Sequence, residues 1–234
     1  GLAEARKAAL DALLADGLPA NRAERWRYTN LRALGQRSFR ASAGASVDAA
    51  LIAHIPRPRL VFVNGWLDTA LSDLSELPAG LSVRALGRVL SEAHARDVVH
   101  LGRRYSASDE VFARANAALA VEGAVIQLEA DAQVEVPLHL VSIGVPESAE
   151  AAWHLRHLID LGSNARLTVV EHVLGFEAHG SLDNTIGQVH LKPGAELTHA
   201  RLQSAGEGAQ LFARVDAALA AGALYRRVDL ELGA

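Results

Sequence analysis

The chain has 234 residues, of which half are apolar and about a fifth are charged, a composition typical of a globular protein with one large or two modest domains. The net charge is −4 and the isoelectric point is near 6.2, so the chain lacks the overall positive field that attracts nucleic acid. Cysteine is absent, which excludes disulfides, thiolate metal ligands and cysteine nucleophiles. The apolar runs are too short to span a bilayer and the first residues lack a signal-peptide pattern. We therefore expect a cytoplasmic protein with neither nucleic-acid nor membrane partners.

The first hundred residues predict helices and mixed structure. An amphipathic helix is expected over 2–16, because leucines and alanines recur on one side before Gly17 and Pro19 end the pattern. A second helix is expected over 22–34, with Trp26 on its apolar side. Further elements expected here are a helical turn over 48–55, a strand over 81–86 and helices over 87–94 and 108–119.

Residues 60–67 predict a β-hairpin. The apolar residues 60–63 and 66–67 flank Asn64-Gly65, a pair that suits a tight type I′ turn. From Gly123 onward, strands alternate with turn residues. We therefore divide the chain into an N-terminal helical and mixed region, 1–104, and a strand-rich region, 105–234.

A loose repeat runs through the strand-rich region. Its markers, Ala132, Ala165, Ala195 and Ala223, are separated by 33, 30 and 28 residues. Each marker follows a turn residue and is flanked by strands with alternating apolar positions. Because a strand repeat near thirty residues is typical of stacked coils, we predict a parallel β-helix. We expect turns at Asn164, Gly194 and Gly222, and an apolar interior that includes Leu155, Ile159, Leu161, Leu167, Val169, Leu197 and Leu219.

Histidines in the repeat region raise the alternative of a metal- or small-molecule-binding β-solenoid. Residues on successive coils stack about 4.8 Å apart, so His157, His172 and His199 could form a metal-binding ladder. Against this, His157 shares the parity of Leu155 and Ile159 and is expected to face the core. We predict no catalytic, cofactor-binding or metal residue in this chain, and keep the three-histidine ladder as the alternative.

Acidic residues raise a second alternative, a carbohydrate-active β-helix enzyme. Asp160, Glu171, Asp183 and Glu196 are too scattered to predict a shared cleft. The pairs Glu171–His172 and Glu196–His199 could serve in acid–base chemistry. Adjacent residues of a strand face apart, which weakens the pair Glu171–His172. No phosphate-binding loop is present, so a partner must hydrolyse any ATP involved.

Six arginines lie in the segment 22–40, interleaved with Trp26 and Tyr28. Such a segment could bind RNA or an acidic partner. The acidic total instead favours a solvated face, with both aromatic residues packed inward to hold the N-terminal helices on the rest of the protein.

Three stretches resemble the SufB/SufD family of iron–sulfur cluster assembly proteins. The first is Arg22-Ala23-Glu24-Arg25-Trp26-Arg27-Tyr28-Thr29 followed by Leu31 and Leu34; this stretch is most similar to SufD. The second is 60–65, Leu-Val-Phe-Val-Asn-Gly, and the third is the block from His154 to His172, continued by 197–202. The resemblance runs with interruptions across the whole chain.

The resemblance implies a helical N-terminal region, a right-handed parallel β-helix and a C-terminal helical region. It implies a non-catalytic scaffold that pairs with a SufB-like paralogue and a SufC-like ATPase; a homodimer is a further alternative. No cofactor is expected on this chain alone, and the iron–sulfur cluster is expected only transiently, at the level of the complex. SufD-like chains are longer, so we expect an N-terminal fragment that lacks the SufC-docking helices and the histidine of the cluster site.

Overall fold

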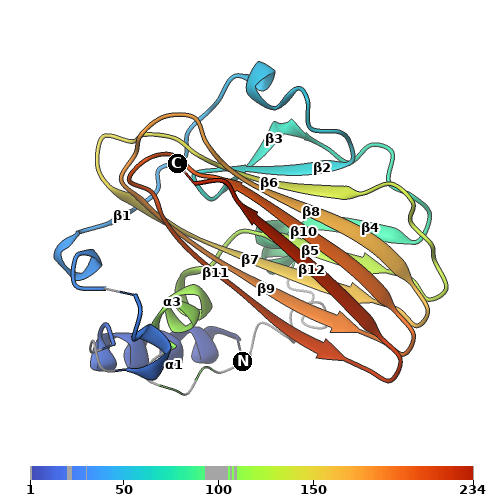
Figure 1. The fold of residues 1–234 in the computed structure, drawn as a ribbon, viewed down its shortest axis with the longest axis horizontal. Coiled ribbons are helices and arrows are strands. Elements are labelled where there is room, and N and C mark those ends of the chain that lie inside the picture. Colours follow the sequence, from blue (N-terminus) through green and yellow to red (C-terminus); the bar gives the residue numbers. More distant parts are fainter. Residues whose placement is uncertain are drawn as a thin grey trace.

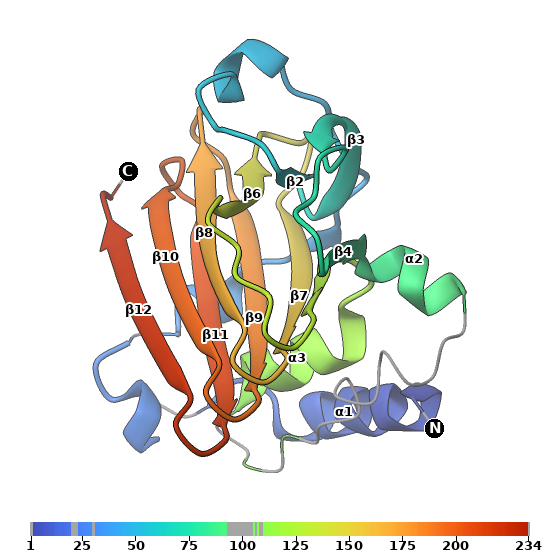
Figure 2. The ribbon, with the colours of Figure 1, turned by 90° about the vertical axis from the view of Figure 1, so that its right-hand side faces the viewer.

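Two six-stranded sheets face each other and enclose the core of the protein (Figures 1 and 2). The computed structural model describes residues 2–19, 23–29, 31–92, 105, 107 and 110–233. Sheet A has the order β11 (Gln210–Leu219), β9 (Ser181–Leu191), β7 (Ala151–Leu161), β5 (Ala124–Leu128), β4 (Leu81–Ala85), with β1 (Arg40–Ala41) paired to β7. Sheet B has the order β12 (Leu224–Glu231), β10 (Glu196–Ser204), β8 (Arg166–Gly175), β6 (Leu138–Gly144), β2 (Arg59–Val63), β3 (Trp66–Asp73).

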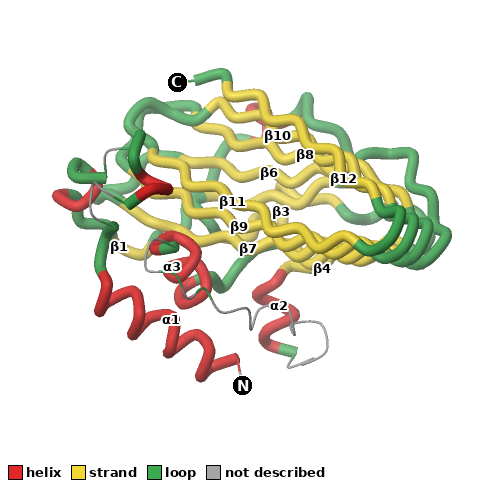
Figure 3. The backbone as a smooth tube through the Cα atoms, turned by 60° about the horizontal axis from the view of Figure 1, so that its bottom comes forward, coloured by secondary structure: helices red, strands yellow, loops and turns green. Residues whose placement is uncertain are grey.

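From β5 onward the chain passes alternately from sheet A to sheet B. Each of the strands from β7 to β12 pairs in parallel with the strand of the preceding coil, as in β7 with β9 and β8 with β10. The coils stack, and their tight turns lie in a row at one side of the body (Figure 3). The result is a β-solenoid of about four turns, which confirms the predicted mainly β fold with a helical and mixed N-terminal region.

The repeat markers lie at these tight turns, as predicted. The residue before each marker has positive φ: 62° at Asp131, 55° at Asn164, 71° at Gly194 and 69° at Gly222. Glycine and asparagine tolerate this region, whereas a β-branched residue would strain it. The turns also bind one another, because the side-chain amide of Asn164 donates to Asp131 at 2.9 Å. Each copy of the repeat therefore corresponds to one coil with one tight turn.

Inward-facing positions of both sheets form the main core. Six of the seven predicted interior residues are fully buried: Leu155, Ile159, Leu161, Leu167, Val169 and Leu197. The prediction for Leu219 is wrong, since its side chain is 50% exposed. Leu219 belongs to β11, the last strand of sheet A, so no further strand covers it within the described chain.

The N-terminal half closes one end of the stack. In sheet A, β4 runs antiparallel to β5. In sheet B, β2 extends the parallel array beside β6, and the predicted hairpin places β3 antiparallel on β2. Asn64 and Gly65 have φ values of 47° and 80°, as the type I′ turn requires. Both sheets thus contain strands from before and after residue 105. The domain boundary predicted near this residue stays a prediction. At the opposite end, β11 and β12 are the last strands of their sheets among the residues that the structure describes.

Helices cover the outer face of sheet A (Figure 3). The α-helices are α1 (Leu2–Asp16), α2 (Leu86–Ser91) and α3 (Val111–Leu119), and short 3-10 helices occupy Glu24–Trp26, Leu34–Gln36 and Ala49–Ile52. The predicted helix over 22–34 is wrong: Arg22 lies outside the described residues and two of the 3-10 turns occupy this part of the chain. Tertiary contacts of Trp26, Leu31 and Leu34 decide its course, since an isolated short helix is marginal.

Of the helices predicted over 87–94 and 108–119, residues 93, 94, 108 and 109 lie outside the described residues. Within the described part of the chain, no helix is both long and apolar enough to cross a bilayer.

Trp26 packs against two stacked phenylalanines. Its ring centroid lies 5.2 Å from that of Phe112 and 6.0 Å from that of Phe212, and these two rings stack at 3.6 Å. This contact joins the N-terminal segment to α3 and β11. The inward packing predicted for Tyr28 is wrong, since its side chain is 92% exposed. It follows the 3-10 turn and faces solvent beside Arg27.

The two aromatic residues therefore make a matched pair of variants. We expect Trp26→Ala to lower the free energy of unfolding by about 1 to 3 kcal/mol, because a partly buried indole loses its ring contacts. We expect Tyr28→Ala to change it by less than about 0.5 kcal/mol. Urea unfolding measures both values, and equal losses would contradict the packing role of Trp26.

Candidate functional site: a polar interior in the later coils

The interior of sheet B changes from apolar to charged along the stack. The parallel register aligns Leu140, Glu171, Arg201 and Asp229 on successive strands from β6 to β12. The neighbouring column changes in the same way, with Val169, His199 and Arg227 in register. Interior charges are costly unless they are paired, so these columns mark the most unusual chemistry in the solenoid.

Glu171 and His199 form the centre of this polar interior. Oε1 of Glu171 lies 3.0 Å from Nε2 of His199, a close contact in which the ring N–H is not well aligned with the carboxylate. Both residues are buried, and Nδ1 of His199 lies 3.0 Å from the hydroxyl of Tyr225 on the next strand. Burial would raise the pKa of Glu171, but His199, with further contributions from His157 and Arg227, lowers it to about 2. Glu171 is therefore a carboxylate at neutral pH, buried inside the solenoid.

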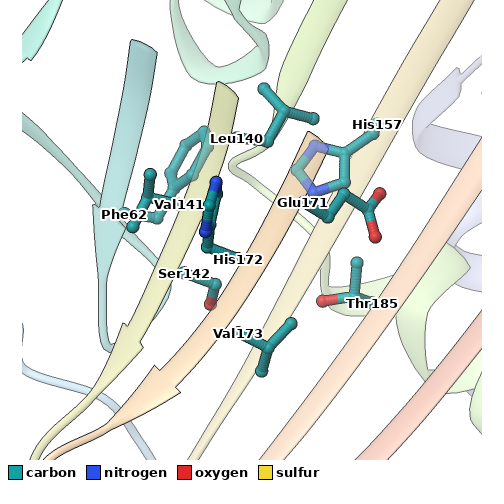
Figure 4. A pocket seen from close by; sticks show the side chains of 9 residues that line it. All are labelled: Phe62, Leu140, Val141, Ser142, His157, Glu171, His172, Val173 and Thr185. Atoms are coloured by element: carbon teal, nitrogen blue, oxygen red, sulfur yellow. The ribbon is translucent and has the colours of Figure 1, made fainter. Parts of the chain in front are cut away.

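His157 approaches the same carboxylate from sheet A, beside Glu171 (Figure 4). Its Nδ1 accepts a hydrogen bond from the backbone N–H of Ala124 at 3.1 Å, so in the neutral ring the proton resides on Nε2. Burial is the main reason that the pKa of His157 is lowered. The predicted core orientation of His157 is confirmed.

A small cavity of about 20 Å³ lies between these groups. It is lined by Phe62, Leu140, Val141, Ser142, His157, Glu171, His172, Val173 and Thr185 (Figure 4). This volume fits about one water molecule with several polar neighbours. The cavity is too small for an organic substrate.

Asp183 is a second buried acid near this cavity. Its carboxylate accepts hydrogen bonds from Thr185 at 2.7 Å and from Ser142 at 3.3 Å. Burial raises the pKa of Asp183 despite these bonds, and the charge of Glu171 raises it further. The two acids therefore differ in environment, because Glu171 faces two histidines and Arg227, whereas Asp183 faces hydroxyls.

The structure brings together two of the three histidines of the predicted ladder. His157 and His199 flank Glu171, whereas His172 follows Glu171 on β8 and projects from the opposite face of the sheet. There Nε2 of His172 lies 2.9 Å from Nδ1 of His139. Among the described ranges, no three histidines and acids are grouped with the geometry of a metal site.

The two acid–base pairs considered from the sequence do not form. Instead, Glu171 and Glu196 contact residues on neighbouring coils. Glu171 contacts His199 rather than His172, and Glu196 binds Arg166 at 3.0 Å rather than His199. Asp160 lines a separate surface depression with Lys192. The carboxylates that a carbohydrate-active enzyme would need are thus distributed over three environments. The sequence signal for Glu171–His199 was their separation of nearly one repeat, which places them on neighbouring strands of one sheet.

Buried neutral histidines predict sensitivity to acid. Burial lowers the pKa of His154 to about 4, while its Nδ1 lies 3.0 Å from the amide of Asn184. An unfolded histidine titrates near 6.5, so between about pH 6.5 and 4 the unfolded chain binds more protons than the folded chain. Stability should therefore fall as the pH drops through this window. We expect urea unfolding at pH 5 to show a loss of about 1 to 2 kcal/mol relative to pH 7.5, and His154→Gln to reduce that loss. An unchanged pH profile in the variant would contradict the role of His154.

Comparisons with known proteins bear on the whole chain. The family model described as the SufBD protein N-terminal region matches residues 1–140, and the model described as the SUF system FeS cluster assembly, SufBD core domain, matches residues 143–234. The chain belongs to the SufBD family of iron–sulfur cluster assembly proteins. The SufBD core-domain match begins within β6, so it contains the later coils and most of the polar interior.

Two curated relatives extend this SufBD assignment. An iron–sulfur cluster assembly SufBD family protein of Synechocystis sp. is 27% identical over 100% of this chain and 54% of the relative. The iron–sulfur cluster assembly protein SufD of Escherichia coli is 29% identical over 90% of this chain and 48% of the relative. The chain spans about half the length of the curated relatives it matches.

Proposed function

We propose that this SufBD chain is part of a non-catalytic, SufD-like scaffold subunit that assembles in the cytoplasm with a SufB-like paralogue and a SufC-like ATPase. The similarity to a SufD protein over 90% of the chain is the observation that supports this proposal most strongly. The iron–sulfur cluster is the cargo of the complex. Because the 234 residues contain no cysteine, any thiolate that holds the cluster comes from outside them.

The interior supports a structural role over catalysis. Glu171, His157 and His199 are buried, and the cavity that Glu171 and His157 line fits about one water molecule. Acid–base catalysis needs contact with a substrate, and this enclosure leaves no room for one. In this proposal the polar interior fixes the register and stiffness of the coils.

Co-purification tests the proposal. The whole encoded protein, tagged at its N-terminus, is co-expressed with SufB-like and SufC-like proteins and purified by size exclusion. We expect a complex that retains both partners. Recovery of the tagged protein alone, or only as a homodimer, would reject the scaffold proposal. Residues 1–234 alone are the control, and we expect them not to retain the SufC-like ATPase.

A further inference from the structure

We propose that a pocket on the outer face of sheet A binds a small planar aromatic carboxylate that also carries an N–H or O–H donor. The pocket lies between α3, the 3-10 turn Glu24–Trp26 and strands β9 and β11, on the side of the sheet that the helices cover (Figure 3). Asn184 lines it from β9, one residue after Asp183, so the pocket and the polar interior lie on opposite faces of sheet A. The proposal does not depend on the scaffold proposal.

The pocket has the size and the walls of a site for one flat ring system. Its volume is about 270 Å³, close to the lower end of the range for ligand pockets, about 300 to 1,000 Å³. Three aromatic side chains line it, with the ring centroid of Trp26 at 5.2 Å from that of Phe112 and 6.0 Å from that of Phe212. The apolar side chains of Ala113 and Ile186 add to this lining. Aromatic rings bind flat molecules by offset or edge-to-face contact, so one or two fused rings fit this space.

Arg25 supplies the group that selects a carboxylate. Arg25 and Arg214 both contact Oε1 of Glu110, at 3.3 and 2.8 Å, and Arg214 also binds Asp216 at 2.9 Å. The side chain of Arg25 is 56% exposed, against 31% for that of Arg214, and its contact with Glu110 is the longer one. Arg25 is therefore the guanidinium that a bound molecule reaches. Because a guanidinium has five N–H donors, Arg25 can bridge Glu110 and the carboxylate of a ligand.

Asn184 supplies a hydrogen-bond acceptor in the lining. Its side chain is buried, and its Nδ2 donates to the backbone oxygen of Phe112 at 2.8 Å and lies 3.0 Å from Nδ1 of His154. Within the part of the chain that the structure describes, its Oδ1 accepts no hydrogen bond. A buried amide oxygen without a donor is costly, so a ligand N–H or O–H that reaches it gains free energy. The pocket thus combines aromatic walls, one accessible cation and one acceptor.

Indole-3-acetate is the probe that tests the proposal, because it has two fused rings, one carboxylate and one N–H donor. We expect isothermal titration of the protein to show one saturable site with a dissociation constant below about 1 mM. The chain has three tryptophans, whose side-chain N–H groups give separate signals in a ¹H–¹⁵N NMR spectrum. We expect the signal of Trp26, assigned with Trp26→Phe, to shift on binding, while those of Trp66 and Trp153 stay unchanged. Absence of a saturable site, or an unchanged Trp26 signal, would overturn the proposal.

Two variants with matched controls locate the binding. Arg25→Gln should weaken the binding of indole-3-acetate at least about threefold, and Phe212→Leu, which removes one aromatic wall, at least about fivefold. Arg226→Gln and Phe176→Leu are the controls and should leave binding unchanged, because Arg226 is 57% exposed on sheet B and Phe176 is exposed in the loop after β8. If Phe212→Leu does not fold, Arg25→Gln and the Trp26 signal carry the result. Equal losses in variants and controls would place the binding elsewhere and reject the pocket.

Two analogues separate the charge from the donor. Indole lacks the carboxylate, and 1-benzothiophene-3-acetate has sulfur in place of the N–H group. We expect each analogue to bind at least about threefold more weakly than indole-3-acetate, and Arg25→Gln to leave the affinity for indole unchanged. Equal affinity for indole would overturn the role of Arg25. Equal affinity for the benzothiophene would overturn the role of Asn184 as acceptor.

Discussion

Replacing Gly123 by alanine should destabilise the protein by more than about 3 kcal/mol or prevent folding. Gly123 has a φ of 147°, which L-residues rarely adopt, and it precedes β5 beside the backbone of Arg156. A Cβ at this position would lie 1.9 Å from the carbonyl oxygen of Arg156 and 2.8 Å from its nitrogen. Neither atom belongs to a flexible side chain, so the two strands would have to separate.

Gly187 provides the matched control for Gly123. A Cβ there would lie 3.3 Å from Cγ2 of Val215, a partly exposed side chain in the last coil, and no positive φ is involved. We expect Gly187→Ala to change the free energy of unfolding by less than about 1 kcal/mol. Soluble yield, melting temperature and urea unfolding measure the difference. Similar behaviour of the two variants would contradict the close approach of β5 and β7 at Gly123.

Glu171→Ala should be the second most damaging substitution, with a loss of about 2 to 4 kcal/mol at pH 7.5. The carboxylate is buried and lies beside His199, His157 and Arg227, so its removal leaves these groups without the negative charge that they face. Because its pKa is lowered to about 2, the stabilisation is present above about pH 4.5 and is lost as the pH falls toward 2.

Glu196 is the control for this substitution. It also pairs with arginines between coils of sheet B, but its partners Arg166 and Arg226 are largely exposed to solvent. We expect Glu196→Ala to lower the free energy of unfolding far less than Glu171→Ala does. Urea unfolding at pH 7.5 compares the two variants. If Glu196→Ala cost as much as Glu171→Ala, burial would not be the source of the effect.

The sequence predicts local features of this fold better than contacts between coils. The turns at Asn164, Gly194 and Gly222 follow from residues that tolerate positive φ, and the Asn64-Gly65 hairpin follows from the same chemistry. The exposure of Leu219 could not be predicted from the alternation of inward and outward residues alone. A residue that faces inward is buried only if a further strand covers its own, and β11 is the last strand of sheet A in the described chain.

Contacts between coils can be predicted only if the register of the paired strands is known, and the composition of the sequence does not give that register. Glu171 and His199 are 28 residues apart, and only the pairing of β8 with β10 places them together. The repeat spacing varies from 28 to 33 residues, so a small shift would face Glu171 toward a different partner. The pair His139–His172 was missed for the same reason, although the two histidines are 33 residues apart, as far as one spacing of the repeat.

The stacked, parallel register of the coils is the claim on which the rest of this account depends, and engineered cysteines test it directly. The chain has no cysteine of its own, so two introduced thiols can pair only with each other. Thr168 and Thr198 are in register on β8 and β10, about 4.8 Å apart, within the range that a disulfide spans. The offset pair Thr168 and Ala200 lies about 8 Å apart, beyond that range. We predict that mild oxidation of monomeric protein bridges Thr168→Cys with Thr198→Cys to completion, as seen by intact mass after alkylation, and leaves the offset pair reduced. Equal bridging of both pairs, or failure of the in-register pair, would contradict the solenoid.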